Sequence, residues 1–297
     1  MRLFISISYN GRAFSGWQKQ KNGPSIQEHL EDAFSVYLRE KIKIIGAGRT
    51  DSGVHAINYI AHLDSNNQAF LTELHTTVYK INAILPPSIV LNHIYRVNDN
   101  AHARFDAQNR TYQYFVHSTK DPFSANFSYF YPYNLEVAAM NQAAQLLLGQ
   151  QDFTSMAKLH SPTKTNICTV NQAIWQPGSP LSAPLSQFCT SHNPPYASLS
   201  PPCTPLSPPC TSFNQSVVFT ITANRFLRNM VRAVVGTLLE VGRGKQEPEW
   251  ILSVLQKKER SAAGSSVPPH ALFLTNIEYP SKITDPTAAN NQTGDKG

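Results

Sequence analysis

Residues 46–56 read Gly46-Ala47-Gly48-Arg49-Thr50-Asp51-Ser52-Gly53-Val54-His55-Ala56, and most of the chain's recognisable chemistry lies in this stretch. It follows an apolar run at residues 42–45, which predicts a short strand. A polar, glycine-rich cluster after a strand is typical of a tight loop, where binding and catalytic groups are often found. Its glycines allow backbone conformations that other residues resist. We therefore expect a functional site at this loop.

Three familiar kinds of site can be compared with the spacing in this loop. A P-loop would need a lysine and a hydroxyl where the chain has Val54 and His55. A dinucleotide-binding loop would need a third glycine where the chain has Asp51, an anion facing the pyrophosphate. A metal site could use Asp51 and His55, but no third ligand has a recognisable spacing. Two interpretations remain, namely a functional carboxylate on a glycine-rich turn and a structural turn with an ion pair between Arg49 and Asp51.

The composition indicates a soluble, basic protein. The chain has 297 residues and a net charge of +6, which suits a polyanionic partner without requiring one. It shows no long apolar span and no signal peptide, so we expect a cytoplasmic protein that does not enter a membrane. None of the four cysteines has C-x-x-C spacing, so neither a zinc site nor a redox pair is indicated.

The first hundred residues alternate between strand and helix patterns. Apolar residues alternate over residues 3–9, which predicts a strand with one buried face. Ser25 and Glu28 have the spacing of a capping box at the start of an amphipathic helix. A second helix is predicted at about 71–83 and a strand at 89–97. This order of strand, helix, strand, helix and strand indicates an α+β unit.

The second half repeats such elements around an unusual segment. Tyr112 and Tyr114 alternate with polar residues, and from this pattern alone a tyrosine that packs in the core is the favoured interpretation of Tyr112. A helix is predicted from a cap at Asn134 to Leu148, with Gly149 ending it. Further strands are predicted at 170–175 and 217–223, a helix from about 249 to 256 after Pro248, and a closing strand at 268–274.

The segment between residues 165 and 224 contains no charged side chain, and it holds ten of the 21 prolines and all four cysteines. Residues 176–215 within it are rich in proline, serine and threonine and show no usable period. Such a composition cannot form a core of its own, and proline blocks strand pairing. We interpret 176–215 as a low-complexity insertion between two strands, with no sign of a function.

A basic stretch follows this segment. Residues 224–232 are predicted to open a helix, on which Arg225, Arg228 and Arg232 would share one sector. Three arginines placed in this way form either a solvated face or a surface that follows a phosphate backbone.

Residues 48–56 resemble the signature G-R-T-D-[AS]-G-V-H-A of the TruA family of tRNA pseudouridine synthases. Four further motifs resemble that family, and the likeness covers nearly the whole chain outside 176–215 and the tail at 281–297. They are the opening pattern at 9–11, 16–18 and 25–27, with Asn10 in place of the usual aspartate; His102-Ala103-Arg104-Phe105 followed by Arg110-Thr111-Tyr112-Gln113-Tyr114; residues 224–232; and residues 268–274, with Ala271 in place of the usual glycine.

The resemblance implies the pseudouridine synthase fold. In that fold, two ferredoxin-like or RRM-like α+β subdomains form one mixed, mostly antiparallel sheet with a central cleft. Here they would span residues 1–103, with the catalytic loop, and 104–280, with the insertion at 176–215. A disordered tail is expected at 281–297.

The resemblance also implies an activity and a set of residues. Members of the family isomerise uridine at positions 38, 39 and 40 of tRNA, as homodimers and without a cofactor or metal. Asp51 would be the catalytic residue, with Tyr112, Arg49 and Arg232 near the uridine. Arg104, Arg225 and Arg228 would contact the rest of the tRNA. Two alternatives are a non-catalytic RNA-binding protein on the same fold and a nucleoside hydrolase that releases free base.

Overall fold

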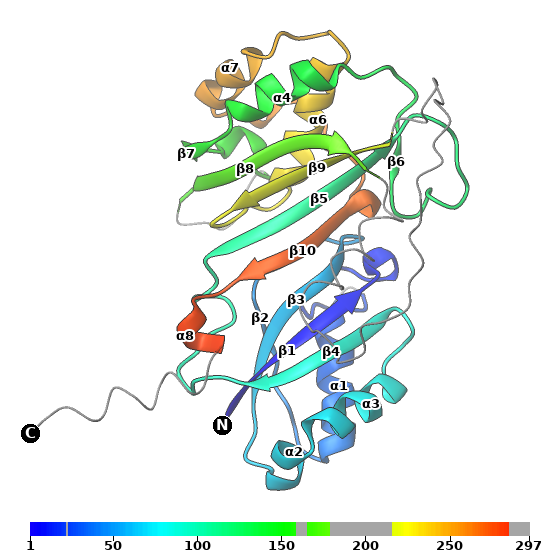
Figure 1. The fold of residues 1–297 in the computed structure, drawn as a ribbon, viewed down its shortest axis with the longest axis vertical. Helices are drawn as coiled ribbons and strands as arrows, with labels where there is room; N and C mark the ends of the chain where they lie inside the picture. The colour runs from blue at the N-terminus through cyan, green and yellow to red at the C-terminus, as the bar shows by residue number, and fades with distance from the viewer. Residues whose placement is uncertain (22, 159–164, 179–215, 285–297) are drawn as a thin grey trace, which may run out of the picture.

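The computed structural model of the protein covers residues 1–297 and describes all of them except 22, 159–164, 179–215 and 285–297. The described elements follow one another along the chain in the order shown in Figure 1: β1 (Arg2–Tyr9), the 3₁₀ helix η1 (Gly11–Ala13), α1 (Ile26–Leu38), β2 (Ile45–Gly46), β3 (His55–Asp64), α2 (Gln68–Thr72), α3 (Leu74–Ile84), β4 (Ile89–Arg96), β5 (Asn109–His117), β6 (Tyr129–Phe130), α4 (Val137–Gln145), β7 (Gly149–Asp152), η2 (Thr154–Met156), β8 (Ile167–Pro177), β9 (Ser216–Ala223), α6 (Met230–Gly242), α7 (Trp250–Lys257), η3 (Arg260–Ala262), η4 (Pro269–Ala271), β10 (Leu272–Glu278) and α8 (Ser281–Thr284).

The described strands form one ten-stranded sheet in the order β4-β1-β3-β10-β5-β9-β8-β7, with β2 beside β3 and β6 beside β5. Neighbours pair antiparallel except β10 with β3 and β5 with β6, which pair parallel. The mixed, mostly antiparallel α+β architecture predicted from the sequence is therefore confirmed. Strand β10 lies between β3 and β5, so the last strand of the sheet joins the N-terminal strands to the C-terminal ones.

Two hydrophobic cores lie along this sheet. One is built from β1, β3, β4 and the helices α1 to α3, and the other from β5, β8, β9 and the helices α4, α6 and α7. Figure 1 shows the two groups of helices at opposite ends of the molecule. The side chain of Tyr112 on β5 packs against both cores. The boundary predicted at residue 103 stays a prediction, but a seam between two packed halves is present, and the candidate site lies at it.

Strand β1 is buried on both faces, whereas its alternation predicted one buried face. Leu3, Ile5 and Ile7 are fully buried, and so is Phe4 on the opposite face. The Phe4 ring contacts the rings of Tyr95 and Tyr279 edge-on, at centroid distances of 6.0 and 5.3 Å. Aromatic side chains from β4 and from the residue after β10 therefore cover a face that the local pattern predicted to be polar.

Strand β3 is the main element that the sequence pattern missed. The strand predicted at 42–45 is largely wrong, because the two-residue β2 shares only Ile45 with it. The ten-residue β3 begins at His55, within the glycine-rich motif itself. Strand β3 lies inside the sheet, and seven of its ten residues, which point to both faces, are buried, so no period-2 pattern marks it. The motif is thus a loop between two strands, and its end is part of the sheet.

Two predicted helices differ in extent. The helix at 71–83 is two helices, α2 and α3, because Glu73 leaves the helical conformation with φ −118° and ψ 43°. The helix predicted at 134–148 is α4, which begins only at Val137. The N–H of the preceding residue, Glu136, donates to the Gly242 carbonyl at 2.8 Å. Gly149 does end the turns after α4, with φ +86°. The Ser25 cap of α1 is confirmed, since its hydroxyl accepts the Glu28 N–H at 3.3 Å.

Most of the predicted insertion, residues 179–215, lies outside the described residues, as do three of the four cysteines. The described start of that segment belongs to the sheet, because β8 continues to Pro177, which pairs with Val217 of β9. Residues 281–284 form the short helix α8, so the described start of the predicted disordered tail is ordered. The rest of that tail, 285–297, lies outside the described residues.

Candidate active site

Two buried tyrosines hold the glycine-rich loop from one side. The Tyr59 hydroxyl donates to the Gly48 carbonyl at 2.5 Å and accepts the Gly48 N–H at 3.3 Å. The hydroxyls of Tyr9 and Thr50 are hydrogen-bonded at 2.9 Å. Burial raises the pKa of both tyrosines, so these hydroxyls keep their protons near neutral pH. The conformation of the loop is therefore set from within the N-terminal core.

Residues 14–17 hold the loop from the other side. The Phe14 carbonyl accepts the Gly53 N–H at 3.3 Å, and the Thr50 carbonyl accepts the Trp17 N–H at 3.3 Å. Gly16 has φ +101°, and a Cβ at this position would lie 2.4 Å from the Thr50 carbonyl oxygen. The opening motif, which the sequence marked only by its resemblance to a family, thus supports the loop that carries Asp51.

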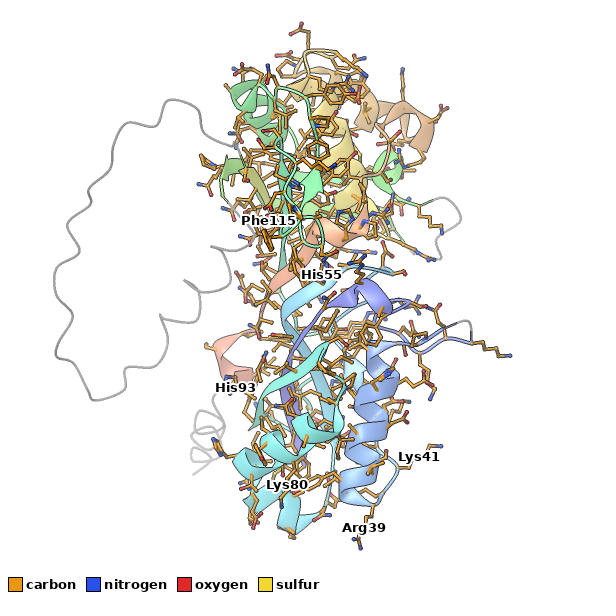
Figure 2. All side chains as sticks on the ribbon, turned by 90° about the vertical axis from the view of Figure 1, so that its right-hand side faces the viewer. Arg39, Lys41, His55, Lys80, His93 and Phe115 are labelled. Atoms are coloured by element: carbon orange, nitrogen blue, oxygen red, sulfur yellow. The ribbon has the colours of Figure 1, made fainter. Side chains whose placement is uncertain are left out.

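His55 connects this loop to the far end of the chain. Its Nδ1 accepts the Gly11 N–H at 3.1 Å, so its Nε2 carries the proton and donates to the His270 carbonyl at 2.9 Å. Burial lowers the pKa of His55 to about 4. Figure 2 shows His55 between the two halves of the molecule. Its contacts are those of a neutral imidazole that joins β3 to the segment before β10.

The buried histidines lead to a prediction about stability and pH. His55 and His62 both have a pKa lowered to about 4 by burial, whereas in the unfolded chain they titrate near 6.5. The unfolded state therefore binds more protons as the pH falls below about 6.5. The free energy of unfolding should fall by up to about 1.4 kcal/mol per pH unit for each histidine until the folded pKa is reached.

This pH dependence can be measured by urea unfolding between pH 7 and pH 4.5. His62 Nδ1 accepts the Ala103 N–H at 3.1 Å, and the variant His62→Asn keeps an acceptor for this N–H. In this variant, the dependence of the free energy of unfolding on pH should be less steep, by the contribution of one histidine. His102, His117 and His270, whose pKa values are also lowered by burial, add to the same trend. A free energy of unfolding that stays constant over this range would contradict the assignment.

Asp51 lies at the edge of an open pocket of about 630 Å³. The loop brings Asp51 and Ser52 to the pocket, and segments of the C-terminal half supply the rest of its wall. The residues lining it are Asp51, Ser52, Lys158, Arg228, Asn229, Arg232 and Arg260. The pocket therefore spans the seam between the two halves, which places the predicted central cleft.

The charge on Asp51 faces Arg228. The Arg228 Nε lies 3.6 Å from the Asp51 Oδ1, and 60% of the arginine side chain and 25% of the aspartate side chain are exposed. An ion pair this exposed contributes about 0–1 kcal/mol. The contact is therefore easily exchanged for another partner of Arg228, such as a phosphate.

Tyr112 lies beside this carboxylate, between β10 and β9 in the sheet. Its ring meets Phe226 edge-on at a centroid distance of 5.0 Å. Burial raises the pKa of Tyr112, and the charge of Asp51 raises it further, so the phenol is neutral near neutral pH. Tyr112 thus packs in the core, as the pattern alone indicated, and is also electrostatically coupled to Asp51.

The three arginines at 225, 228 and 232 do not share a helical face, which corrects the prediction from their spacing. Helix α6 begins at Met230, and Asn229 before it has φ +68°, in the left-handed region. Residues 224–229 are therefore not helical. Arg228 and Arg232 line the pocket, whereas Arg225 does not. The role predicted for Arg225 stays a prediction.

Arg49 and Arg104 are both exposed and do not line the pocket. Within the part of the chain that the structure describes, the Arg49 side chain forms no hydrogen bond or ion pair. The Arg104 guanidinium lies 5.7 Å from the ring centroid of Phe105, which is itself 75% exposed. Both arginines are therefore available at the surface next to the loop.

Sequence reasoning missed Lys158 and Arg260, which contribute to the pocket from segments that no motif marked. The Lys158 N–H donates to the Arg228 carbonyl at 2.9 Å. The Arg260 guanidinium donates to the Gly264 carbonyl at 3.0 Å and to the Ser266 hydroxyl at 2.7 Å. Lysine and arginine are common in the rest of the chain outside 165–224, so no local signal could have selected these two.

Arg110 is a second omission, although it lies within a quoted motif. Its guanidinium donates to four backbone carbonyls, and together these bonds join the motif loop, the turn after residue 103 and the segment before α6. The acceptors are Ala107 at 2.7 Å, Asn224 at 2.7 Å, Arg104 at 2.9 Å and Ala47 at 3.3 Å. Burial lowers the pKa of Arg110, which still remains charged at neutral pH.

Among the described residues, no group of three or more histidine, cysteine, aspartate or glutamate side chains is arranged to hold a metal ion. No helix within the described ranges is long and apolar enough to cross a membrane.

Comparison with known proteins identifies the family. A sequence profile of the family described as tRNA pseudouridine synthase matches residues 5–106 and 143–280. The tRNA pseudouridine synthase A of Bacteroides thetaiotaomicron is 43% identical over 282 residues, which are 95% of this chain and 92% of that protein. The protein of the same name from Bacillus subtilis is 33% identical over 283 residues, 94% of this chain and 99% of that protein.

A chain in the crystal structure of a Cbf5-Nop10-Gar1 complex is similar to this protein with a TM-score of 0.31 and 10% sequence identity. The match covers 92% of this chain and 58% of that chain. A structural similarity this low supports no conclusion. The sequence matches suffice. The chain belongs to the tRNA pseudouridine synthase family, whose members are isomerases.

Proposed function

We propose that this protein isomerises uridine to pseudouridine at positions 38, 39 and 40 of the tRNA anticodon stem-loop, with Asp51 as the nucleophile. The observation that supports it best is the position of Asp51. Among the described residues that line the pocket, it is the one carboxylate, it is surrounded by basic side chains, and its loop is held from two sides. A glycine-rich turn with a merely structural ion pair would not need such a pocket.

The reaction suits an ionised carboxylate. The bond between N1 of uracil and C1′ of ribose breaks, the base turns, and C5 bonds to C1′ while C5 loses a proton and N1 gains one. The product is therefore an isomer of the substrate. A carboxylate can attack and later leave. Asp51 could attack C6 of the base or C1′ of the ribose, or it could remove a proton from the ribose.

The positions of the remaining residues support the roles that we propose for them. The uridine must leave the base stack to reach Asp51, and the exposed Arg49 could enter the gap that it leaves. The neutral Tyr112 phenol can stack on the extruded uracil, and because its pKa is raised, almost no phenolate is present to act as a base in the resting enzyme. Arg232 lines the pocket, while Arg104 and Arg225 would contact phosphates farther along the tRNA.

The proposal can be separated from its rivals by incubating the protein with tRNA labelled in its uridines and resolving the nucleosides. We expect a carbon-linked nucleoside in intact tRNA. Released uracil would indicate a hydrolase, and unchanged uridine with retained tRNA binding would indicate a non-catalytic RNA-binding protein. Either of these results would overturn the proposal.

We also propose, from the family resemblance, that the protein works as a homodimer in the cytoplasm. Light scattering on the purified protein, alone and with tRNA, should give the mass of two chains. A monomer that retains full activity at nanomolar concentration would contradict this.

Gly48 provides a prediction about how closely RNA approaches the loop. A Cβ on Gly48 would meet no atom within 4 Å, and its φ is not in the left-handed region. Gly48→Ala should therefore leave stability unchanged or raise it by about 0.4–1 kcal/mol. If the tRNA backbone occupies this open space, the same change should lower kcat/KM about tenfold or more.

The matched control is Gly46→Ala, whose Cβ would lie 2.1 Å from the Tyr59 hydroxyl and 2.5 Å from the Trp17 ring. This variant should lose stability, in contrast to Gly48→Ala. Thermal melting of the two variants measures their stability, and initial rates on tRNA measure their activity. Full activity in Gly48→Ala would show that no RNA atom comes near this position.

A further inference from the structure

The pocket beside Asp51 contains more positive charge than its carboxylate can balance. Four basic side chains line it, namely Lys158, Arg228, Arg232 and Arg260. Arg228 is the one that approaches Asp51 within the ion-pair distance. Uracil is uncharged, so recognition of the base does not require Arg232 or Arg260. The phosphodiester groups on either side of a target nucleotide are anions of the kind that arginine binds.

The Arg260 guanidinium is fixed in place with part of its donor capacity unused. Its Nη1 donates to the Gly264 carbonyl at 3.0 Å and to the Ala263 carbonyl at 3.4 Å, and its Nη2 donates to the Ser266 hydroxyl at 2.7 Å. An arginine has five N–H donors. The Nε–H and one Nη2 hydrogen therefore have no acceptor among the described residues.

Arg232 is held by the same short segment. Its Nε donates to the Val267 carbonyl at 2.7 Å, and the Val267 N–H donates to the Arg232 carbonyl at 3.2 Å. Its Nη groups have no acceptor in the described part of the chain. Asn229, which also lines the pocket, donates to the Ser266 hydroxyl at 2.6 Å. Residues 263–267 thus fix Asn229, Arg232 and Arg260 against one another.

Two fixed guanidinium groups with unused donors thus lie at one pocket, without an anionic acceptor for those donors among the residues that the structure describes. We propose that Arg232 and Arg260 form a subsite for a phosphodiester group adjacent to the target nucleotide, an inference that rests on the proposed function. The subsite holds the sugar-phosphate backbone while the base is extruded toward Asp51. Because both side chains are anchored to backbone carbonyls, little side-chain freedom is lost when the phosphate binds.

The test replaces single phosphates in a tRNA substrate by uncharged methylphosphonates. With the wild-type protein, a methylphosphonate immediately 5′ or 3′ of the target uridine should weaken binding and kcat/KM by about 10- to 100-fold, the effect of losing charge-assisted hydrogen bonds. The same replacement several nucleotides away should cost much less. If neither adjacent replacement costs more than the remote one, the subsite does not exist.

Variants then assign the effect to Arg260. Arg260→Gln should bind the natural substrate about as weakly as the wild type binds the methylphosphonate substrate. For Arg260→Gln, replacing the phosphate by a methylphosphonate should then weaken binding further by less than about twofold. Arg260→Lys keeps the charge without the forked donors and should retain part of the effect. If Arg260→Gln does not fold, Arg260→Lys still tests the assignment. The matched control is Arg39→Gln, at the far end of α1 in Figure 2, where the methylphosphonate should cost as much as in the wild type.

Equal methylphosphonate costs in the wild type, Arg260→Gln and Arg260→Lys would overturn the assignment. Failure of the subsite and failure of the proposed function can be told apart, because the dissociation constants of the RNA can be measured even if no pseudouridine is formed. Absence of product with natural tRNA would refute the function, while the pattern of binding would still confirm or refute the subsite.

Discussion

Asp51→Asn is expected to abolish pseudouridine formation while leaving tRNA binding intact or slightly tighter. Asparagine keeps the size of the side chain and the conformation of the loop, but it has neither the charge nor the nucleophilic oxygen. The single-turnover rate should fall by more than about 1,000-fold, which corresponds to about 4 kcal/mol in the barrier. Removing a negative charge from a pocket lined by four basic side chains should not weaken the binding of a polyanion.

The single-turnover rate and the dissociation constant of tRNA should be measured on the same preparation. Asp32→Asn, an exposed change on α1, is the matched control and should behave like the wild type. A rate for Asp51→Asn within tenfold of the wild type, about 1.4 kcal/mol, would exclude a nucleophilic role for Asp51.

Arg110→Met is expected to lower both stability and activity. Methionine fills a similar volume but leaves the carbonyls of Ala107, Asn224, Arg104 and Ala47 without the donor that joins them. The hydrogen bonds to Ala107 and Ala47 are part-buried, whereas those to Asn224 and Arg104 are exposed, so water can replace the donor at the latter two. At about 1–3 kcal/mol for each part-buried acceptor and little for the exposed ones, the free energy of unfolding should fall by about 2–4 kcal/mol. The loop that carries Asp51 and the segment that carries Arg228 would then lose their common anchor.

Urea unfolding measures the loss of stability, and kcat/KM at a temperature where the variant is folded should fall at least about tenfold. Arg96→Met is the matched control, because the Arg96 side chain donates to a single carbonyl, that of Leu71 at 2.8 Å. Arg110→Lys should be intermediate, since one ammonium group cannot reach all four acceptors. A variant Arg110→Met as stable as Arg96→Met would show that the four bonds are not cooperative.

The sequence predicts local elements well where neighbouring residues determine them. The cap at Ser25 and the turn at Gly149 depend on residues within a few positions, and both appear in the structure. Strand β3 was missed because its neighbours β1 and β10 are distant in the sequence, as the pairs Tyr9–Ala56 and His55–Phe273 show, a relation that no local pattern contains. For the same reason, the second buried face of β1, covered by Tyr95 and Tyr279, could not be predicted.

The site shows the same division. The motif placed Asp51 on a glycine-rich loop, and the structure brings that loop to a pocket. The arginine spacing predicted a shared helical face, but Asn229 adopts a left-handed conformation and α6 begins after it. Lys158 and Arg260 reach the pocket through tertiary folding, and the role of Arg110 depends on which carbonyls surround it. These contacts become visible only when the chain is folded.

The measurement that tests the central claim most directly is the mapping of pseudouridine in tRNA transcripts that differ only in whether uridine occupies positions 38, 39 and 40. With the wild-type protein, we predict the carbon-linked nucleoside at those positions when uridine is present and at no other position. With Asp51→Asn, we predict none at any position. Product at other positions would contradict the proposed substrate, and equal amounts of product from the wild type and Asp51→Asn would contradict the assignment of Asp51.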